Sequence, residues 1–108
     1  MAATQLIARR RLLYTSQDNA KPFPFAVGVT APREVSTGTN DEALHDAMAA
    51  CDIVFEGLDV APIEVRGADS LQALQHACDI DPVLRGLQRS HGFEFFWDDG
   101  SVYFEPSI

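Results

Sequence analysis

The stretch GADSLQALQHACDIDPVL, residues 67–84, decides the fold expected for this chain, because it joins a helix start signal, an apolar stripe and a break. Asp69 or Ser70 is expected to cap a helix, since a short polar side chain can accept hydrogen bonds from the free N–H groups of a first turn. Apolar residues then recur at spacings of three and four, which predicts a narrow stripe facing a sheet. These residues are Leu71, Ala73, Leu74, Ala77 and Cys78.

A second start signal follows within the same stretch. Asp81 and Pro82 form a cap and first-turn pair, because proline disfavours a helical conformation in the residue before it. The helix is expected to restart through Val83, Leu84 and Leu87. Residues 69–89 therefore read as a kinked helical segment that serves as core scaffold.

Alternating side chains predict strands on both sides of this helical segment. Four strands are expected before it, at residues 6–14, 23–29, 51–56 and 63–65. Pro22 and Pro24 cannot donate ladder hydrogen bonds, which places the start of the second strand at a sheet edge. A short helix is expected over residues 41–50, capped by Thr39 or Asn40.

The sequence FEFFWDDGSVYFEP after the helical segment predicts a β-hairpin. A two-residue type I′ turn at Asp99 and Gly100 would place Trp97 opposite Val102, and Phe96 opposite Tyr103. One face is then expected to join the core. Its members are Phe93, Phe95, Trp97, Val102 and Phe104.

These elements predict one α+β domain over residues 1–108. The expected architecture is an antiparallel β-sheet of about five to six strands, a meander with a closing C-terminal β-hairpin, and a kinked helix packed on one face. The length of 108 residues suffices for a single core without metal or disulfide support. A composition of 46% hydrophobic and 22% charged residues is ordinary for a globular chain.

The charge is unevenly distributed along the chain. The net charge is −8; residues 1–33 hold five basic groups and one acid, giving +4, and the rest hold three basic groups and fifteen acids, giving −12. Such a field repels nucleic acid and anionic lipid, and it attracts a basic partner at a rate that falls with salt. The sequence therefore predicts a basic protein partner, no nucleic acid and no membrane.

Neither targeting nor disulfide chemistry is expected. No apolar run approaches a membrane span, and the arginine-rich first residues lack the apolar region of a secretory signal, so a cytoplasmic location is expected. Cys51 and Cys78 have no metal-binding spacing, and both are expected to be reduced and buried.

No segment gives positive support for catalysis, and neither catalytic residues nor cofactors are predicted. Glu42 and His45 have the spacing of a carboxylate-bridged metal helix, but such sites need the motif twice, so an acidic solvated face is favoured. His76 and Cys78 point in different directions on a helix and cannot form a nucleophile and base pair. Arg9 and Arg11 share one strand face, where pairing with the chain's own acids is favoured over phosphate binding.

The acidic, aromatic side of the hairpin is the candidate partner-binding surface. Tyrosine and phenylalanine are frequent interface anchors, and acidic neighbours steer a basic partner. Its residues are Glu94, Phe96, Asp98, Asp99, Tyr103 and Glu105. The alternative is that Phe96 and Tyr103 are covered within the monomer.

The segments LIARRRLLYT, CDIVFEGL and RGADSLQALQHAC together resemble a family of short bacterial proteins classified as a domain of unknown function. The resemblance rests on an Ala-Arg-Arg start and a Gly-x-Asp-Ser-x-Gln-Ala-Leu helix entry. The matching residues are Ala8, Arg9, Arg10, Gly67, Asp69, Ser70, Gln72, Ala73 and Leu74. It implies no catalytic residue; small bacterial proteins of this kind include immunity partners of secreted toxins.

Three functions follow as hypotheses. The first is a small acidic protein-binding domain, such as an immunity-type neutraliser of a basic bacterial toxin or effector. The second is a small-molecule-binding domain or enzyme with a pocket between helix and sheet, where Arg9, His76 or Cys78 converge. The third is a homo-oligomeric structural module that pairs through an exposed edge strand.

Overall fold

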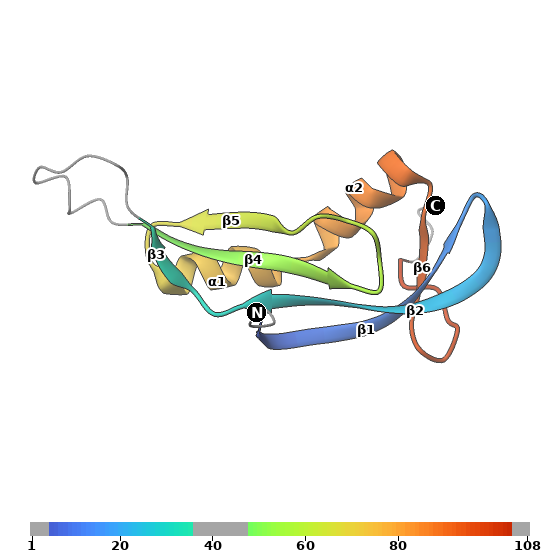
Figure 1. Cartoon of the computed structure of the whole chain (residues 1–108), viewed down its shortest axis with the longest axis horizontal. Coiled ribbons are helices and arrows are strands. Elements are labelled where there is room, and N and C mark those ends of the chain that lie inside the picture. The colour runs from blue at the N-terminus through green and yellow to red at the C-terminus, as the bar shows by residue number, and fades with distance from the viewer. Residues whose placement is uncertain (1–4, 36–47, 105–108) are drawn as a thin grey trace, which may run out of the picture.

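The structure is a computed structural model, and it describes residues 5–35 and 48–104 of the chain (Figure 1). Six strands and two helices lie in these ranges. In chain order they are β1 (Leu6–Ser16), β2 (Asn19–Thr30), β3 (Arg33–Val35), β4 (Met48–Glu56), β5 (Ile63–Gly67), α1 (Ser70–Cys78), α2 (Asp81–His91) and β6 (Glu94–Phe96). The predicted α+β class is confirmed.

The sheet is antiparallel and begins as the expected meander. β1 pairs with β2, β2 with β4 and β4 with β5, so consecutive long strands are neighbours. β3 continues the line of β2 beyond Ala31 and Pro32 and pairs with the start of β4. Pro32 has no N–H to donate, which fits a break in the strand at this point. After the helices the chain returns to the other side of the sheet, where β6 pairs with β1.

The two faces of the sheet differ sharply. Residues directly opposite one another in an antiparallel pair share a face, and Leu12, Phe25 and Val27 lie on the face that the helices cover. Apolar side chains of the strands and helices form one core there. Its members are Leu12, Phe25, Val27, Val29, Ala49, Cys51, Ile53, Phe55, Leu58, Ala73, Ala77, Ile80, Leu84, Leu87 and Phe95. The other face, called the open face below, carries charged side chains among apolar ones; the charged residues are Arg9, Arg11, Asp52, Glu56, Glu64 and Arg66.

α1 packs on β4 and β5 through small residues. Ala73 and Ala77 are fully buried, whereas Leu71 is 67% exposed and Cys78 is exposed. The expected stripe was therefore wrong at Leu71 and at Cys78, and the burial expected for Cys78 was wrong with it. The physical reason is close approach: a Cβ added at Gly67 would lie 2.4 Å from the backbone N of Ala73, so only a narrow alanine strip of the helix meets the sheet.

The start of α1 and the break before α2 were predicted correctly. The Asp69 side chain accepts a 2.8 Å hydrogen bond from the Gln72 N–H, and Asp79 and Ile80 separate the two helices. One detail was wrong. Ile80, which offers no side-chain cap, stands at the N-cap of α2, and Asp81 lies inside the first turn, where its carboxylate serves another partner.

The strand boundaries differ from those expected in two places. β2 begins at Asn19 rather than at Phe23, but Pro24 faces only β1, since pairing with β4 starts at Ala26. The predicted edge position of the prolines is thus confirmed. Residues 48–50 of the expected short helix are instead the start of β4, and the rest of that helix lies outside the described residues.

The register expected for the C-terminal hairpin was wrong. Phe96, not Trp97, is opposite Val102. The connection is a five-residue loop, residues 97–101, in which the Trp97 N–H donates to the Ser101 carbonyl and the Gly100 N–H donates to the Trp97 carbonyl, both at 2.8 Å. Asp99 favours this loop over a two-residue turn because its carboxylate accepts hydrogen bonds from the N–H and hydroxyl of Ser101.

Candidate functional site

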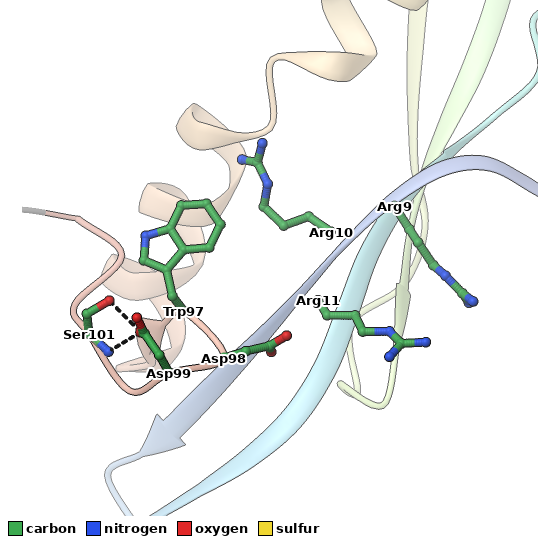
Figure 2. A pocket seen from close by; sticks show the side chains of 7 residues that line it. All are labelled: Arg9, Arg10, Arg11, Trp97, Asp98, Asp99 and Ser101. Carbon is green, nitrogen blue, oxygen red and sulfur yellow. Dashed lines mark hydrogen bonds between the residues drawn. The ribbon is translucent and has the colours of Figure 1, made fainter.

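A hollow of about 530 Å³ lies between β1 and loop 97–101 (Figure 2). β1 contributes three consecutive arginines, and the loop contributes an indole ring and two carboxylates. The lining residues are Arg9, Arg10, Arg11, Trp97, Asp98, Asp99 and Ser101. Segments from opposite ends of the chain are neighbours here because β6 pairs with β1.

The three arginines divide between the two faces of the sheet. Figure 2 shows Arg10 directed toward Trp97, while Arg9 and Arg11 extend the other way. This is the alternation of an extended strand. Arg9 donates to the Glu56 carboxylate at 3.2 Å on the open face, so the intramolecular pairing expected for it is confirmed.

Arg10 packs against the aromatic side chains of the C-terminal segment. Its Cζ lies 5.2 Å from the centre of the Trp97 ring, and its Nη1 donates to the Tyr103 hydroxyl at 2.6 Å. A guanidinium over an aromatic face is attracted by the ring's quadrupole. Arg10 therefore helps to hold the indole in place.

Tyr103 connects the cluster of Arg10 and Trp97 to α2. Its hydroxyl donates to the Asp81 carboxylate at 2.6 Å, and its ring centre lies 4.8 Å from that of Trp97. Burial raises the pKa of the Tyr103 hydroxyl, and the hydrogen bond to Asp81 raises it further. The side chain is half-buried, and its polar group is engaged within the monomer.

The acids of the loop are exposed, and one of them is fixed in place. Hydrogen bonds from Ser101 lower the pKa of Asp99, so this carboxylate keeps its charge to a lower pH than an ordinary aspartate. Asp98 points to the open face, where it borders a second hollow of about 390 Å³. That hollow is also lined by Arg11, Leu12, Pro24, Phe25, Ala26 and Glu56.

The structure reassigns which apolar side chains reach solvent at this end of the molecule. Trp97 is 39% exposed and Val102 is 54% exposed. Phe96, which pairs across from Leu13, and Tyr103 are half-buried instead. The sequence predicted a two-residue turn, whereas the structure has a five-residue loop. The longer loop shifts the strand pairing, and this shift changes which side chains face outward.

The predicted site residues fall into three groups. Asp98 and Asp99 line the hollow of Figure 2, and the Tyr103 ring packs against Trp97, which also lines it. Glu94 is exposed on β6, one residue from the buried Phe95, and Phe96 lies on the open face beside β1. Glu105 lies outside the described residues. Sequence reasoning missed Trp97 and Arg10 as site residues, because no local pattern signals a contact between the first strand and the last.

A separate, smaller hollow of about 190 Å³ lies between β1 and β2 and the junction of the two helices. It brings Arg9 and Cys78 together with Val27, Val29 and Ile80. His76 is not part of it; its Nδ1 lies 3.4 Å from the Arg66 carbonyl oxygen. Ligand pockets usually span about 300–1,000 Å³, so this hollow offers room for one side chain rather than for a substrate.

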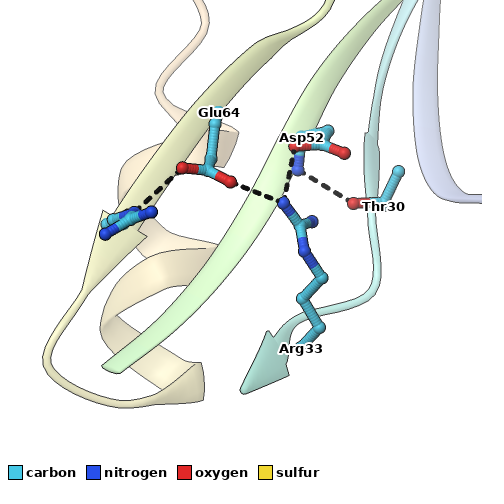
Figure 3. A network of polar contacts seen from close by, with 5 residues as sticks. Thr30, Arg33, Asp52 and Glu64 are labelled. Atoms are coloured by element: carbon cyan, nitrogen blue, oxygen red, sulfur yellow. Dashed lines mark hydrogen bonds and ion pairs between the residues drawn. The ribbon is translucent and has the colours of Figure 1, made fainter. Parts of the chain in front are cut away.

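Charged side chains on the open face form an ion-pair network between strands (Figure 3). Arg33 donates to Asp52 at 3.3 Å and to Glu64 at 2.7 Å, and Arg66 donates to Glu64 at 2.9 Å. These contacts raise the pKa of Arg33 and lower that of Glu64. The network links β3, β4 and β5.

Comparisons with known protein families, with curated proteins and with solved structures found no match to this chain. The resemblance to a family of short bacterial proteins stays a prediction. Glu42 and His45 lie outside the described residues. In the part of the chain that is described, no helix is long and apolar enough to cross a membrane.

Proposed function

We propose that this chain is a small protein-binding domain that docks a basic partner on the surface formed by Trp97, Asp98 and Asp99. The observation that carries the proposal is the exposure of an indole ring beside two carboxylates on one ordered loop. Tryptophan is among the residues most enriched in binding hot spots. Acidic groups around such an anchor steer a cationic partner toward it.

Rigidity of the loop supports this role. Two backbone hydrogen bonds close loop 97–101, Ser101 fixes Asp99, and Arg10 packs against the Trp97 ring. A surface that is already ordered loses little conformational entropy when it binds. The loop is therefore suited to act as a preformed docking surface.

The distribution of charge also supports a basic partner. Arg9, Arg33 and Arg66 each pair with an acid of the same chain. Glu94 and Asp98 are exposed and have no ion-pair partner among the described residues. In its specific form the proposal is an immunity-type neutraliser of a basic bacterial toxin or effector, acting in the cytoplasm.

The test is recovery of a partner from the native organism's lysate with tagged protein at low salt and at about 0.5 M salt, where charge is screened beyond a few ångström. Trp97→Ala should abolish recovery of a basic protein, and Asp98→Asn should reduce it. Leu71→Ala removes an apolar side chain on α1 that is more exposed than Trp97, and it should leave recovery unchanged. Asp79→Asn, which removes a carboxylate at the end of α1, should also leave recovery unchanged.

Recovery that high salt leaves intact would contradict the charge-steered part of the proposal. Equal losses from Trp97→Ala and from Leu71→Ala would show that the loop is not the docking surface. Circular dichroism of each variant confirms that the fold is intact before the comparison is made.

A further inference from the structure

We infer that the outer edge of β1 binds an extended acidic segment of another protein, which adds to the sheet as a strand. The inference goes beyond the proposed function, since it concerns the backbone edge of β1 and an acidic ligand rather than the loop and a basic one. Strand addition satisfies the ligand's backbone through main-chain hydrogen bonds, and its side chains supply the specificity.

The edge itself is the first observation. β6 pairs with β1 only from Leu13 to Thr15. From Leu6 to Leu12, β1 pairs with β2 on one side and has no strand partner on the other side among the described residues. An unpaired strand edge presents a row of N–H and C=O groups that can template another strand.

Charge decides which strand fits this edge. Arg9 and Arg11 project from it on the open face and Arg10 on the helix face, so an added strand meets an arginine on either side. Like charges opposite one another in adjacent strands are destabilising, and opposite charges are stabilising. A second copy of β1 would bring six arginines onto two neighbouring strands, whereas an acidic segment is complementary.

The contacts that Arg9 and Arg11 already make within the chain do not prevent them from pairing with an acidic strand. The Arg9–Glu56 pair is about half exposed on both sides, and exposed ion pairs are worth little. Arg11 makes no ion pair within the described ranges. Both guanidinium groups can therefore turn toward carboxylates of an added strand.

The small hollow by the helix junction favours a particular residue type in the ligand on the helix face of β1. It lies on the helix side of β1, and Arg10, which is engaged by Tyr103, borders it. The rest of its lining on this side is mostly apolar: Ala8, Val27, Val29, Cys78 and Ile80. Side chains of an added strand alternate between the two faces. The geometry therefore favours a ligand with carboxylates toward Arg9 and Arg11 and a β-branched apolar residue toward the hollow.

The experiment uses three capped peptides on the full-length protein, followed by fluorescence anisotropy and by amide chemical shifts. The probe is TEVEVET; TKVKVKT reverses the charge, and TEPEPET keeps the charge but removes backbone donors. The first peptide should bind, and the other two should bind at least about tenfold more weakly, which corresponds to 1.4 kcal/mol. Amide shifts should concentrate on residues 6–12.

Variants of the arginines complete the test. Combined Arg9→Gln and Arg11→Gln changes should weaken TEVEVET binding about tenfold or more. Arg66→Gln removes an equally exposed arginine from the open face at the opposite edge of the sheet and should leave binding unchanged. Trp97→Ala, which disables the proposed basic-partner surface, should also leave it unchanged, so the two proposals can fail separately.

Three results would overturn the inference. Absence of TEVEVET binding to the folded protein would mean that the arginines only protect the edge from unwanted pairing. Equal binding of the proline peptide would exclude strand addition. A dimer in sedimentation equilibrium that dissociates on the Arg9 and Arg11 changes would assign the edge to a second copy of the chain.

Discussion

At the scale of single residues, Tyr103 connects the most distant parts of the chain. Its hydroxyl accepts from Arg10 on β1 and donates to Asp81 on α2. The two hydrogen bonds involve charged partners at a half-buried position. One phenolic oxygen thus helps hold the C-terminal segment against both layers of the fold.

Tyr103→Phe should lower the free energy of unfolding by about 1 kcal/mol at neutral pH, since net hydrogen-bond contributions are of this size. Because burial and Asp81 raise the Tyr103 pKa above its ordinary value of 10.0, the folded state favours the neutral phenol. This contribution is present below the ordinary pKa and is lost as pH rises through the raised pKa. The difference between wild type and variant in urea unfolding should therefore shrink above about pH 10. Equal stabilities at neutral pH would contradict this role.

The two cysteines offer a second residue-scale prediction. Cys51 is fully buried in β4, and burial raises the pKa of its thiol, whereas Cys78 is exposed at the end of α1. Because the thiolate is the reactive form, a thiol reagent at about pH 8 should modify the exposed Cys78 quickly in the folded protein. Cys78→Ser should remove the fast reaction, and Cys51 should react only after unfolding. Fast reaction of both thiols would contradict the burial of Cys51.

At the scale of elements, the contact between α1 and β5 depends on the absence of side chains. Gly67 lies under the helix at Ala73, and both are buried. The φ of Gly67 is not in the left-handed region, so its backbone conformation does not require glycine. Glycine is needed here because a side chain would not fit. The helix therefore lies closer to the sheet than a leucine stripe would allow.

Gly67→Ala should destabilise the protein by about 1–3 kcal/mol, the usual cost of overpacking a core, because its Cβ would overlap the helix backbone. Gly86→Ala is the matched control: nothing lies within 4 Å of a Cβ at this position of α2. That change should stabilise the protein by about 0.5–1 kcal/mol, because alanine favours the helix. Urea unfolding of both variants measures the difference. Equal effects of the two substitutions would refute the close-packing account.

At the scale of the whole molecule, the C-terminal segment is part of the main core. Phe95 is 2% exposed and packs with Phe25, their ring centres 5.5 Å apart. The strand that carries Phe95 pairs with β1, so the two ends of the described fold stabilise one another. Such an arrangement predicts a single cooperative domain.

Urea unfolding should therefore give coincident transitions from tryptophan fluorescence and from far-ultraviolet circular dichroism, the usual test of two-state behaviour. Trp97 is the chain's single tryptophan and reports on the C-terminal loop, whereas circular dichroism reports on all strands and helices. Phe95→Ala should shift both transitions together, by about 3–5 kcal/mol. Val102→Ala, at an exposed position of the same hairpin, should shift neither by more than about 0.5 kcal/mol. An earlier fluorescence transition would show that the C-terminal segment unfolds separately.

The sequence by itself determined the local features of this protein. Alternation located the long strands, Asp69 marked the start of α1, and Pro82 marked the break before α2. These signals are readable because each depends on the conformational preferences of a few adjacent residues. The excess of acidic residues in the chain also predicted that Arg9 pairs with an acid of its own chain.

Only the tertiary structure decided the features that depend on distant neighbours. It set which residues of α1 are buried, the register around Val102, and the meeting of Arg10 with Trp97 and Tyr103. Leu71 is as apolar as any core residue, yet it is exposed because the alanine strip beside it allows closer packing on the sheet. Burial and contact are properties of the space between elements, and that space is defined only once β6 pairs with β1 and the helices close over the sheet.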